Sequence, residues 1–226
     1  YSFYQSLHAE LSDFNVTDNL PELRLAFHAA PWMAIKGTYA FDYVLVGGDA
    51  YSYSHILSPS AVFTVWKGIT AALEYTYRTN HFMNSDLFAS NSDRTGFNNT
   101  VGVTCSVPVG SYGSVKVGYA YDSEKTREDF WDYTGNKVLA GLQVNLPYQL
   151  YLDLYGEYLT KNYGGLFPST TDRREDIAKT ASISFTKILS DTFSLSAGQL
   201  YRRNKSNSDL FDYNRAISSL FINARF

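Results

Sequence analysis

The sequence predicts an all-β fold, a closed antiparallel transmembrane β-barrel of about twelve strands, formed by one domain over residues 1–226. Three observations support this prediction. Polar and apolar residues alternate with a period of two in about twelve segments, the pattern of strands with one polar and one apolar face. Short reversals alternate with longer polar connections along the chain. The apolar face of almost every segment lacks a charge along its middle, as contact with lipid requires.

The composition favours strands and excludes several functions. Aromatic residues make up 16% of the 226 residues, and aromatic side chains favour strands. No apolar run approaches the about 18 residues of a membrane-spanning helix, whereas a barrel strand needs only about 9–11 residues. The net charge of −3 gives no basic excess for nucleic acid. The single Cys105 cannot form an internal disulfide, and no histidine or cysteine spacing suggests zinc, so we expect no metal and no cofactor.

Five alternating segments are expected in the first part of the chain. They are 3–11, 23–29, 35–45, 57–66 and 69–77. In the last of these, for example, Leu73 and Tyr75 lie on the face opposite Glu74. A tight reversal at Pro31 separates the second segment from the third, because proline is excluded from strand interiors and common at turns. Another reversal, at Gly68, separates the fourth from the fifth.

Seven further segments follow, with reversals at 109–113, near Pro147 and at 190–191. The segments are 101–107, 115–121, 138–144, 150–158, 180–186, 193–201 and 218–226. Longer polar connections are expected near 12–20, 46–54, 80–99, 125–135, 162–176 and 203–214. Short turns at one end of a barrel and longer loops at the other are typical of outer-membrane barrels, with the short turns on the periplasmic side. Both termini are therefore expected on the periplasmic side.

The last segment closes on an aromatic residue. One face of this strand carries Leu220, Ile222, Ala224 and Phe226. This pattern resembles the C-terminal assembly signal of bacterial outer-membrane β-barrels. The resemblance implies a location in the bacterial outer membrane, contact with outer-membrane lipid, and insertion by the barrel assembly machinery. The alternative is the last strand of a soluble sheet that happens to end in Phe.

The opposite face of the segments carries charges of both signs. The charges predicted to line the interior are Glu10, Glu22, Arg24, Lys36, Asp42, Glu74, Arg78, Lys116, Asp122, Glu124, Lys137, Asp153, Glu157, Arg202 and Arg225. Two interpretations stay open. The charges line a polar conduit, or they pair into a network that fills a narrow interior, since small barrels are filled by side chains. In the second case Arg24, Lys36, Arg78, Lys116 and Arg202 would pair with Glu10, Glu22, Asp42, Glu74 and Asp122.

No catalytic residue is predicted. Nucleophilic hydrolysis needs a hydroxyl beside an oriented base, which is most often a histidine. The four histidines are His8, His28, His55 and His81. His8 and His28 face the predicted interior, where a hydrogen-bonded histidine is the commoner explanation, and no serine and histidine pair falls on the outer face. We therefore expect that the chain is not an enzyme.

Several short segments together carry a family resemblance. They are Tyr1–Ser6, Phe14–Asn15, Arg173–Asp176, Ser206–Asn207 and Tyr213–Arg215. They resemble the barrel domain that follows periplasmic tetratricopeptide repeats in Gram-negative outer-membrane proteins, such as surface lipoprotein assembly modifiers and barrels that export exopolysaccharide. The resemblance implies a channel or export pore that works with a periplasmic repeat domain or a subunit of an envelope complex. The chain departs from these proteins because it shows no repeats and fewer strands.

The alternative function is a non-conducting structural or interaction barrel, a scaffold for a surface or envelope complex. It rests on the mixed signs of the interior charges and on aromatic residues in the predicted loops. These aromatic residues are Phe82, Phe88, Phe130, Trp131 and Phe211. Exposed aromatic side chains are often the residues that dominate the binding of a partner.

Overall fold

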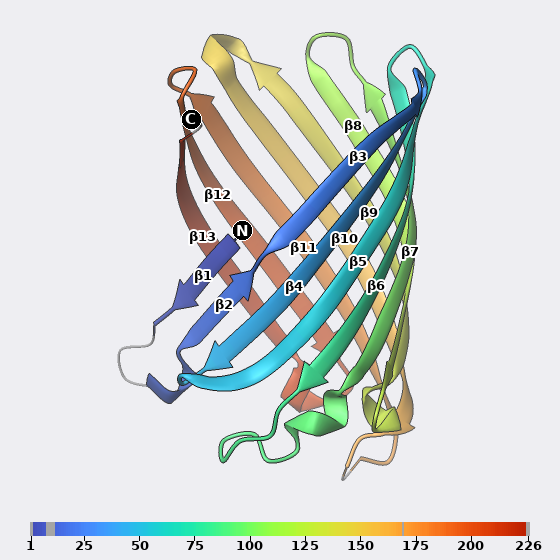
Figure 1. Cartoon of the computed structure of the whole chain (residues 1–226), viewed down its shortest axis with the longest axis vertical. Helices are drawn as coiled ribbons and strands as arrows, with labels where there is room; N and C mark the ends of the chain where they lie inside the picture. The colour runs from blue at the N-terminus through green and yellow to red at the C-terminus, as the bar shows by residue number, and fades with distance from the viewer. Residues whose placement is uncertain (1, 8–11, 169, 225–226) are drawn as a thin grey trace.

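The computed structural model describes residues 2–7, 12–168 and 170–224. In these residues thirteen strands form one sheet (Figure 1), and every strand pairing is antiparallel. The strands are β1 (Ser2–Ser6), β2 (Val16–Leu20), β3 (Glu22–Ala30), β4 (Met33–Val46), β5 (Asp49–Trp66), β6 (Ile69–Phe82), β7 (Gly96–Pro108), β8 (Gly113–Thr126), β9 (Tyr133–Leu146), β10 (Leu150–Leu166), β11 (Arg173–Ile188), β12 (Phe193–Ser206) and β13 (Tyr213–Ala224). The predicted all-β, antiparallel fold is confirmed.

Short 3-10 helices lie between some of the strands. They are η1 (Ser12–Phe14), η2 (Asn91–Arg94), η3 (Asp129–Trp131), η4 (Pro147–Gln149) and η5 (Asp209–Phe211). Among the described residues, no helix has the length and apolar character needed to cross a membrane.

The strand count differs slightly from the prediction of about twelve. Twelve strands follow one another along a single path through the sheet, and β3 pairs β4 off this path. β2 and β3 both lie against β4 because Pro21, which has no N–H to donate, interrupts the ladder between them. The carbonyl of Pro21 still accepts a hydrogen bond from the Phe41 backbone at 3.0 Å, so the chain keeps its course along β4.

The sheet curls strongly, and its two ends come to the same side of the molecule (Figure 1). In the described residues β13 pairs only β12 and β1 pairs only β2, so no ladder joins the two ends. The structure is therefore a curved antiparallel sheet of the kind that forms a barrel wall.

Two of the predicted loops are wrong. The predicted loop 12–20 contains β2, which continues in the direction of β3. The predicted loop 46–54 is a two-residue turn at Gly47 and Gly48, after which β5 begins at Asp49. Both glycines have positive φ, at 64° and 94°, which a tight hairpin turn requires and which only glycine adopts without strain.

The remaining connections are sorted by length between the two ends of the sheet (Figure 1). The connections 83–95, 127–132, 167–172 and 207–212 lie at one end, named here the loop end. The connections 31–32, 67–68, 109–112, 147–149 and 189–192 lie at the other, named the short-turn end. The sorting predicted from the sequence holds except at Gly47 and Gly48.

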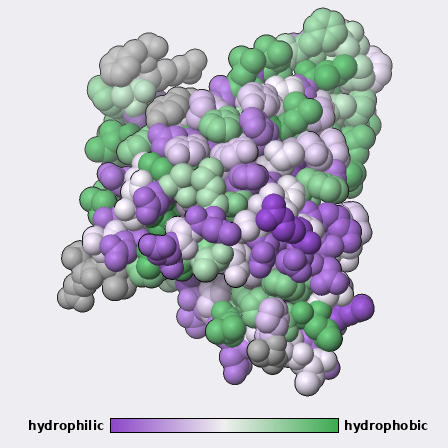
Figure 2. Space-filling model, turned by 60° about the horizontal axis from the view of Figure 1, so that its bottom comes forward, coloured by the Kyte–Doolittle hydropathy of each residue, from purple (hydrophilic) through white to green (hydrophobic). Residues whose placement is uncertain are grey.

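The two faces of the sheet differ in burial and chemistry. Every buried strand residue lies on one face, which the curvature shields and which we call the concave face; examples are Ser54 at 3% and Asp176 at 4% exposure. The opposite, convex face carries large apolar side chains that are about half exposed, such as Leu73 at 54% and Val103 at 50%. Figure 2, in which the loop end comes forward, shows hydrophilic residues over much of that end and hydrophobic residues along the flanks.

Candidate functional site

The strand register places all the described charges that were predicted for the interior on the concave face. Asp42 lies opposite Ser54, which lies opposite Asn80, and the same face continues through each neighbouring strand to Arg202 on β12. Glu10 and Arg225 lie outside the described residues. The described residues of the proposed assembly signal, Leu220, Ile222 and Ala224, share the convex face of β13, whereas Phe226 lies outside the described residues.

The predicted charge pairing is partial. Arg24 contacts Glu22 and Arg78 contacts Asp42, both at 2.5 Å, and the Lys137 Nζ lies 4.0 Å from a Glu157 oxygen. Among the described residues, no ion pair involves Lys36, Lys116, Arg202, Glu74 or Asp122. The interior is therefore not a fully compensated network of ion pairs.

Two of the most buried charged side chains, Arg174 and Asp176, belong to a cluster that the sequence analysis did not predict. We name Lys161, Tyr163, Arg174, Asp176 and Phe211 the Arg174 cluster. Arg174 and Asp176 are 8% and 4% exposed. Arg174 Nε donates to Asp176 Oδ1 at 3.0 Å and Nη2 donates to Oδ2 at 2.5 Å, the two-pronged geometry that guanidinium and carboxylate favour. The guanidinium carbon lies 3.3 Å from the ring centre of Phe211 and 4.2 Å from that of Tyr163.

The carboxylate of Asp122 lies close to the Arg174 cluster but is satisfied by neutral donors. Asn98 Nδ2 donates to it at 2.7 Å, Thr100 Oγ1 at 3.0 Å and the Tyr133 hydroxyl at 2.9 Å. Asp122 therefore needs no cation partner, which explains why the pairing expected for it is not formed. The Lys161 ammonium instead lies 3.6 Å from the ring centre of Tyr133, a cation–π contact.

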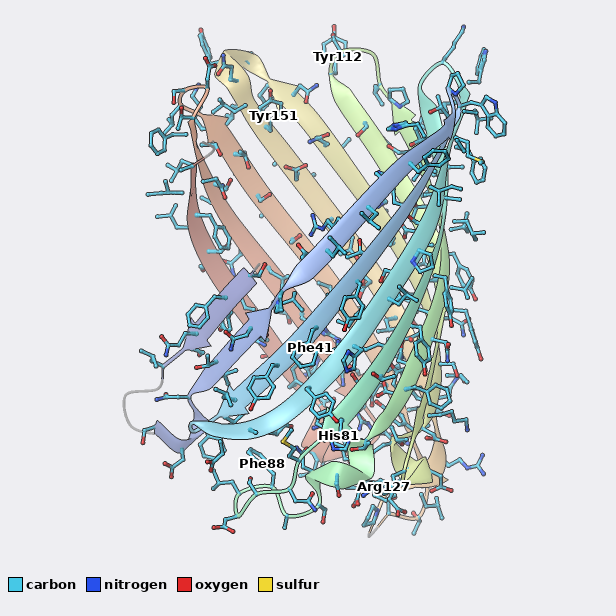
Figure 3. The ribbon with its side chains drawn as sticks, viewed as in Figure 1. Phe41, His81, Phe88, Tyr112, Arg127 and Tyr151 are labelled. Carbon is cyan, nitrogen blue, oxygen red and sulfur yellow. The ribbon has the colours of Figure 1, made fainter. Side chains whose placement is uncertain are left out.

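Aromatic side chains cover the cluster from the loop end. Trp131, Phe167 and Phe211 come from three different connections and pack edge to face, with ring centres 5.3–5.9 Å apart. We name these three residues the aromatic lid. Phe88, at the loop end in Figure 3, packs on Tyr51 at 5.1 Å. Of the aromatics proposed to bind a partner, Phe130, Trp131 and Phe211 thus pack against other loop rings, whereas Phe82 is the last residue of β6 and is not in a loop.

Several cavities adjoin the Arg174 cluster, and two of them are each lined by four of its five residues. The smaller, about 140 Å³, is lined by Leu159, Lys161, Tyr163, Arg174, Asp176, Ala178, Arg202, Asn204 and Tyr213. The larger, about 300 Å³, is lined by Arg94, Glu124, Thr126, Trp131, Tyr133, Lys161, Tyr163, Arg174 and Phe211. Lys161, Tyr163 and Arg174 border both cavities, so these side chains separate two small polar spaces at the loop end of the concave face.

The described histidines lie away from this cluster. His55 Nδ1 is 2.8 Å from the Tyr39 hydroxyl, and the His81 ring stacks on Tyr53 at 4.7 Å, both on the convex face. His28 lies on β3, and His8 lies outside the described residues. Within the described part of the chain, no three His, Cys, Asp or Glu side chains are grouped to hold a metal ion. The expectation that the chain is not an enzyme stays a prediction.

One loop carboxylate gives a pH-dependent prediction. Asp132 accepts hydrogen bonds from Lys125 Nζ at 2.8 Å and from the Thr126 backbone at 2.6 Å. Burial alone would raise the pKa of Asp132, but these hydrogen bonds outweigh burial and lower the pKa below its ordinary 3.8. A lowered carboxyl pKa contributes stability above the unfolded pKa, and this stability is lost as the pH falls through the folded pKa. We expect the protection of the amides around 125–133 against hydrogen exchange, measured relative to their intrinsic exchange rates, to fall below about pH 4.

The matched control for this prediction is Asp191, which lies in a connection at the short-turn end and receives no side-chain hydrogen bond from the described residues. Asp132→Asn should accelerate exchange around 125–133 already at neutral pH and remove the acid-induced step. Asp191→Asn should leave that segment unchanged at every pH. Protection of this segment that changes neither with pH nor with Asp132→Asn would contradict the prediction.

No protein-family model matches the chain, and a search of curated proteins finds no match. The fold and the site therefore define the class to which it can be assigned: an all-β protein with one strongly curved antiparallel sheet, polar on its buried concave face and apolar on its exposed convex face. The resemblance to barrels that follow tetratricopeptide repeats stays a prediction.

Proposed function

We propose that the chain forms an outer-membrane β-barrel, closed around its polar concave face, that acts as a channel or export-related pore. One observation carries this proposal. The face that the curvature buries is rich in charged and polar side chains, whereas the exposed face carries the large apolar ones. Water as the outer solvent would favour the reverse arrangement. Lipid outside and water or paired polar groups inside account for both faces.

The direction of the strands supports closure. β3 and β13 both run from the loop end to the short-turn end, so they could meet only in parallel. β1 runs antiparallel to β2 and therefore also opposite to β13. If β1 lies between β13 and β2, the barrel has twelve strand positions, with β2 and β3 sharing one of them, and neighbouring positions run in opposite directions. Bacterial barrels have an even number of strands. Closure also removes the two free edges, whose unpaired backbone groups lipid would not satisfy.

Closure is tested by cysteine pairs in a Cys105→Ser background. Tyr4 lies on the concave side of β1, opposite Asp18, and three residues of β13 share that face: Arg215, Ile217 and Ser219. Tyr4→Cys combined with a cysteine at each of these in turn should give one efficient disulfide in membranes, because bridged Cα atoms lie within about 7 Å. Tyr4→Cys with a cysteine at Ser184, on β11, is the control. No disulfide at any of the three positions would contradict closure through β1.

Four small concave residues leave room for a conduit near the short-turn end, beside larger side chains such as Tyr151 and Tyr155 on the same face. Gly118, Gly141, Gly198 and Ser184 lie on this face in the half of their strands nearer the short turns. At the other end the Arg174 cluster and the aromatic lid fill the space. In the proposed topology the short turns are periplasmic, so the short-turn end would receive a substrate from a periplasmic repeat domain or another envelope subunit.

Conductance in planar lipid bilayers tests the pore. The purified chain should give small, steady currents, and Phe211→Ala should raise them by removing one ring of the lid. Phe185→Ala on the convex face is the matched control and should leave the current unchanged. If both the parent and Phe211→Ala are silent, the pore is excluded. The alternative, a non-conducting structural or interaction barrel, then stands, and the filled loop end is the observation that favours it.

A further inference from the structure

The two cavities beside the Arg174 cluster carry an excess of positive charge. Four cationic side chains, Arg94, Lys161, Arg174 and Arg202, line one or both cavities, against two carboxylates, Glu124 and Asp176. Outside the lining, Arg215 lies directly opposite Arg202 in the ladder between β12 and β13, and the Asp122 carboxylate lies close to Lys161, so these two further charges offset each other. A small space with this balance of charge favours an anion over a cation.

Most of these cations are not neutralised by the protein. Of the ion pairs among the described residues, none involves Arg94, Lys161 or Arg202. Arg94 donates to the Tyr51 hydroxyl and lies over the rings of Phe82 and Trp131. Of these four cations, only Arg174 has a carboxylate partner among the described residues, namely Asp176.

Arg174 also keeps one donor unused. Its side chain is 8% exposed, and its Nη1 is buried without a hydrogen-bond partner among the described residues. The Nε of Arg202 is likewise buried without a hydrogen-bond partner among the described residues. Arg202 and Arg174 both line the smaller of the two cavities. Buried donors are rarely left unsatisfied, because each costs about 1–3 kcal/mol. Two unused guanidinium donors beside one polar cavity therefore point to an acceptor that is not part of the chain.

We propose that the cavities beside the Arg174 cluster bind a small oxyanion, a carboxylate or phosphate group, through Arg174, Arg202 and Lys161. Oxygen atoms of such a group match the planar guanidinium donors, which a halide does not. The aromatic walls of Tyr163 and Phe211 keep the guanidinium of Arg174 in place for this contact. The inference goes beyond the proposed pore, because anion binding is measured in detergent solution whether or not the barrel conducts.

The chain offers its own reporter. Of the three tryptophans, Trp131 lines the larger cavity, whereas Trp32 and Trp66 lie at the short-turn end. In a Trp32→Phe, Trp66→Phe background, sodium phosphate should change the Trp131 fluorescence with a saturable dependence. Sodium chloride at the same ionic strength should not. A change that does not saturate, or an equal change with chloride, would overturn the proposal.

Two neutralising variants locate the site. Lys161→Gln and Arg202→Gln remove cations that form no ion pair with described residues, and each should weaken phosphate binding about tenfold, the loss of one charge-assisted contact. Lys116→Gln is the control, because Lys116 also faces the concave side but lies toward the short-turn end. Equal affinity in the parent and in both cavity variants would overturn the proposal.

The sharpest variant changes affinity in the opposite direction. Asp176→Asn removes the carboxylate that occupies two donors of Arg174 and adds one positive charge to the cavity balance. Phosphate should then bind at least tenfold more tightly. If Arg174 only stabilised the fold, the affinity for phosphate would not increase. Unchanged or weaker binding by folded Asp176→Asn would overturn the proposal. If this variant does not fold, Lys161→Gln and Arg202→Gln decide.

Discussion

Replacing Arg174 with alanine is expected to lower the free energy of unfolding by about 3–5 kcal/mol, the usual cost of removing one partner from a buried ion pair. Asp176, 4% exposed, would keep its charge with little contact with solvent. The Tyr163 hydroxyl, 3.5 Å away, would be its remaining described side-chain donor. The contacts of the guanidinium with the rings of Tyr163 and Phe211 would be lost as well. Denaturant unfolding of the protein refolded into lipid vesicles measures the loss.

The chain contains a matched control at the same end of the sheet. Arg203 pairs with Asp212 at the same 2.5 Å as Arg174 with Asp176, but the two side chains are 39% and 28% exposed. Solvent screens the exposed pair, so Arg203→Ala should cost only about 0–1 kcal/mol. Similar losses for Arg174→Ala and Arg203→Ala would contradict the assignment of the larger cost to burial.

A double replacement separates the charge from the space it fills. Arg174→Met with Asp176→Leu removes both charges and keeps most of the side-chain volume. Buried ion pairs can often be replaced in this way at little cost in stability. We expect the double variant to recover most of the stability lost by Arg174→Ala, and to abolish phosphate binding at the same time. A double variant as unstable as Arg174→Ala would show that hydrogen-bond geometry, and not the unpaired charge, dominates the loss.

The faces of the strands were predictable because the alternation of polar and apolar residues is local. In β7, for example, Val101 and Val103 lie on the convex face and Thr100 and Thr104 on the concave face, as the sequence predicted. This regularity needs only the pleat of the strand. It fixed the all-β fold and the face of each described charge without knowledge of the strand register.

The strand ends were less predictable, and for one physical reason. Asn80, Asn98 and Asn204 were predicted to be loop residues because they are polar, yet all lie within strands, with side chains on the concave face. Because the concave face is polar as far as the ends of the strands, polar residues there do not show where a strand ends and a loop begins. The Gly47–Gly48 turn was a different kind of omission, since two adjacent glycines between alternating segments are a known hairpin signal.

The Arg174 cluster could be predicted only in part. Arg174 and Asp176 are two residues apart and so share a face of any strand that contains both, but the sequence analysis assigned them to the loop 162–176. Extending that strand would have found the pair. Their meeting with Lys161 and Tyr163 depends on the register between β10 and β11, and their meeting with Phe211 on the course of a connection. Local sequence specifies neither of these.

A lysine at the middle of the convex face is the second large effect. Val103 is half exposed, at 50%, and lies in the central part of β7. If this face contacts the hydrocarbon of a bilayer, Val103→Lys should lower the free energy of unfolding by about 2–4 kcal/mol, because the ammonium loses its water. If the face is in water, the same change should stay within about 0.5 kcal/mol, as for other exposed positions. Denaturant unfolding in lipid vesicles again measures the difference.

Depth along the strand provides the control that distinguishes lipid from any other apolar surroundings. Val115 lies on the same convex face, paired with Val107, but near the short-turn end of β8. A lysine there reaches the membrane interface, so Val115→Lys should cost only about 0–1 kcal/mol. If Val103→Lys loses much of the free energy of unfolding and Val115→Lys loses little, the cost depends on depth, as it does in a bilayer. Small losses of unfolding free energy in both variants would show that the convex face does not contact lipid. They would contradict the proposed outer-membrane barrel but not the antiparallel fold. Equal large losses would instead indicate a protein partner that covers the whole convex face, since a protein interface has no reason to weaken toward the short turns.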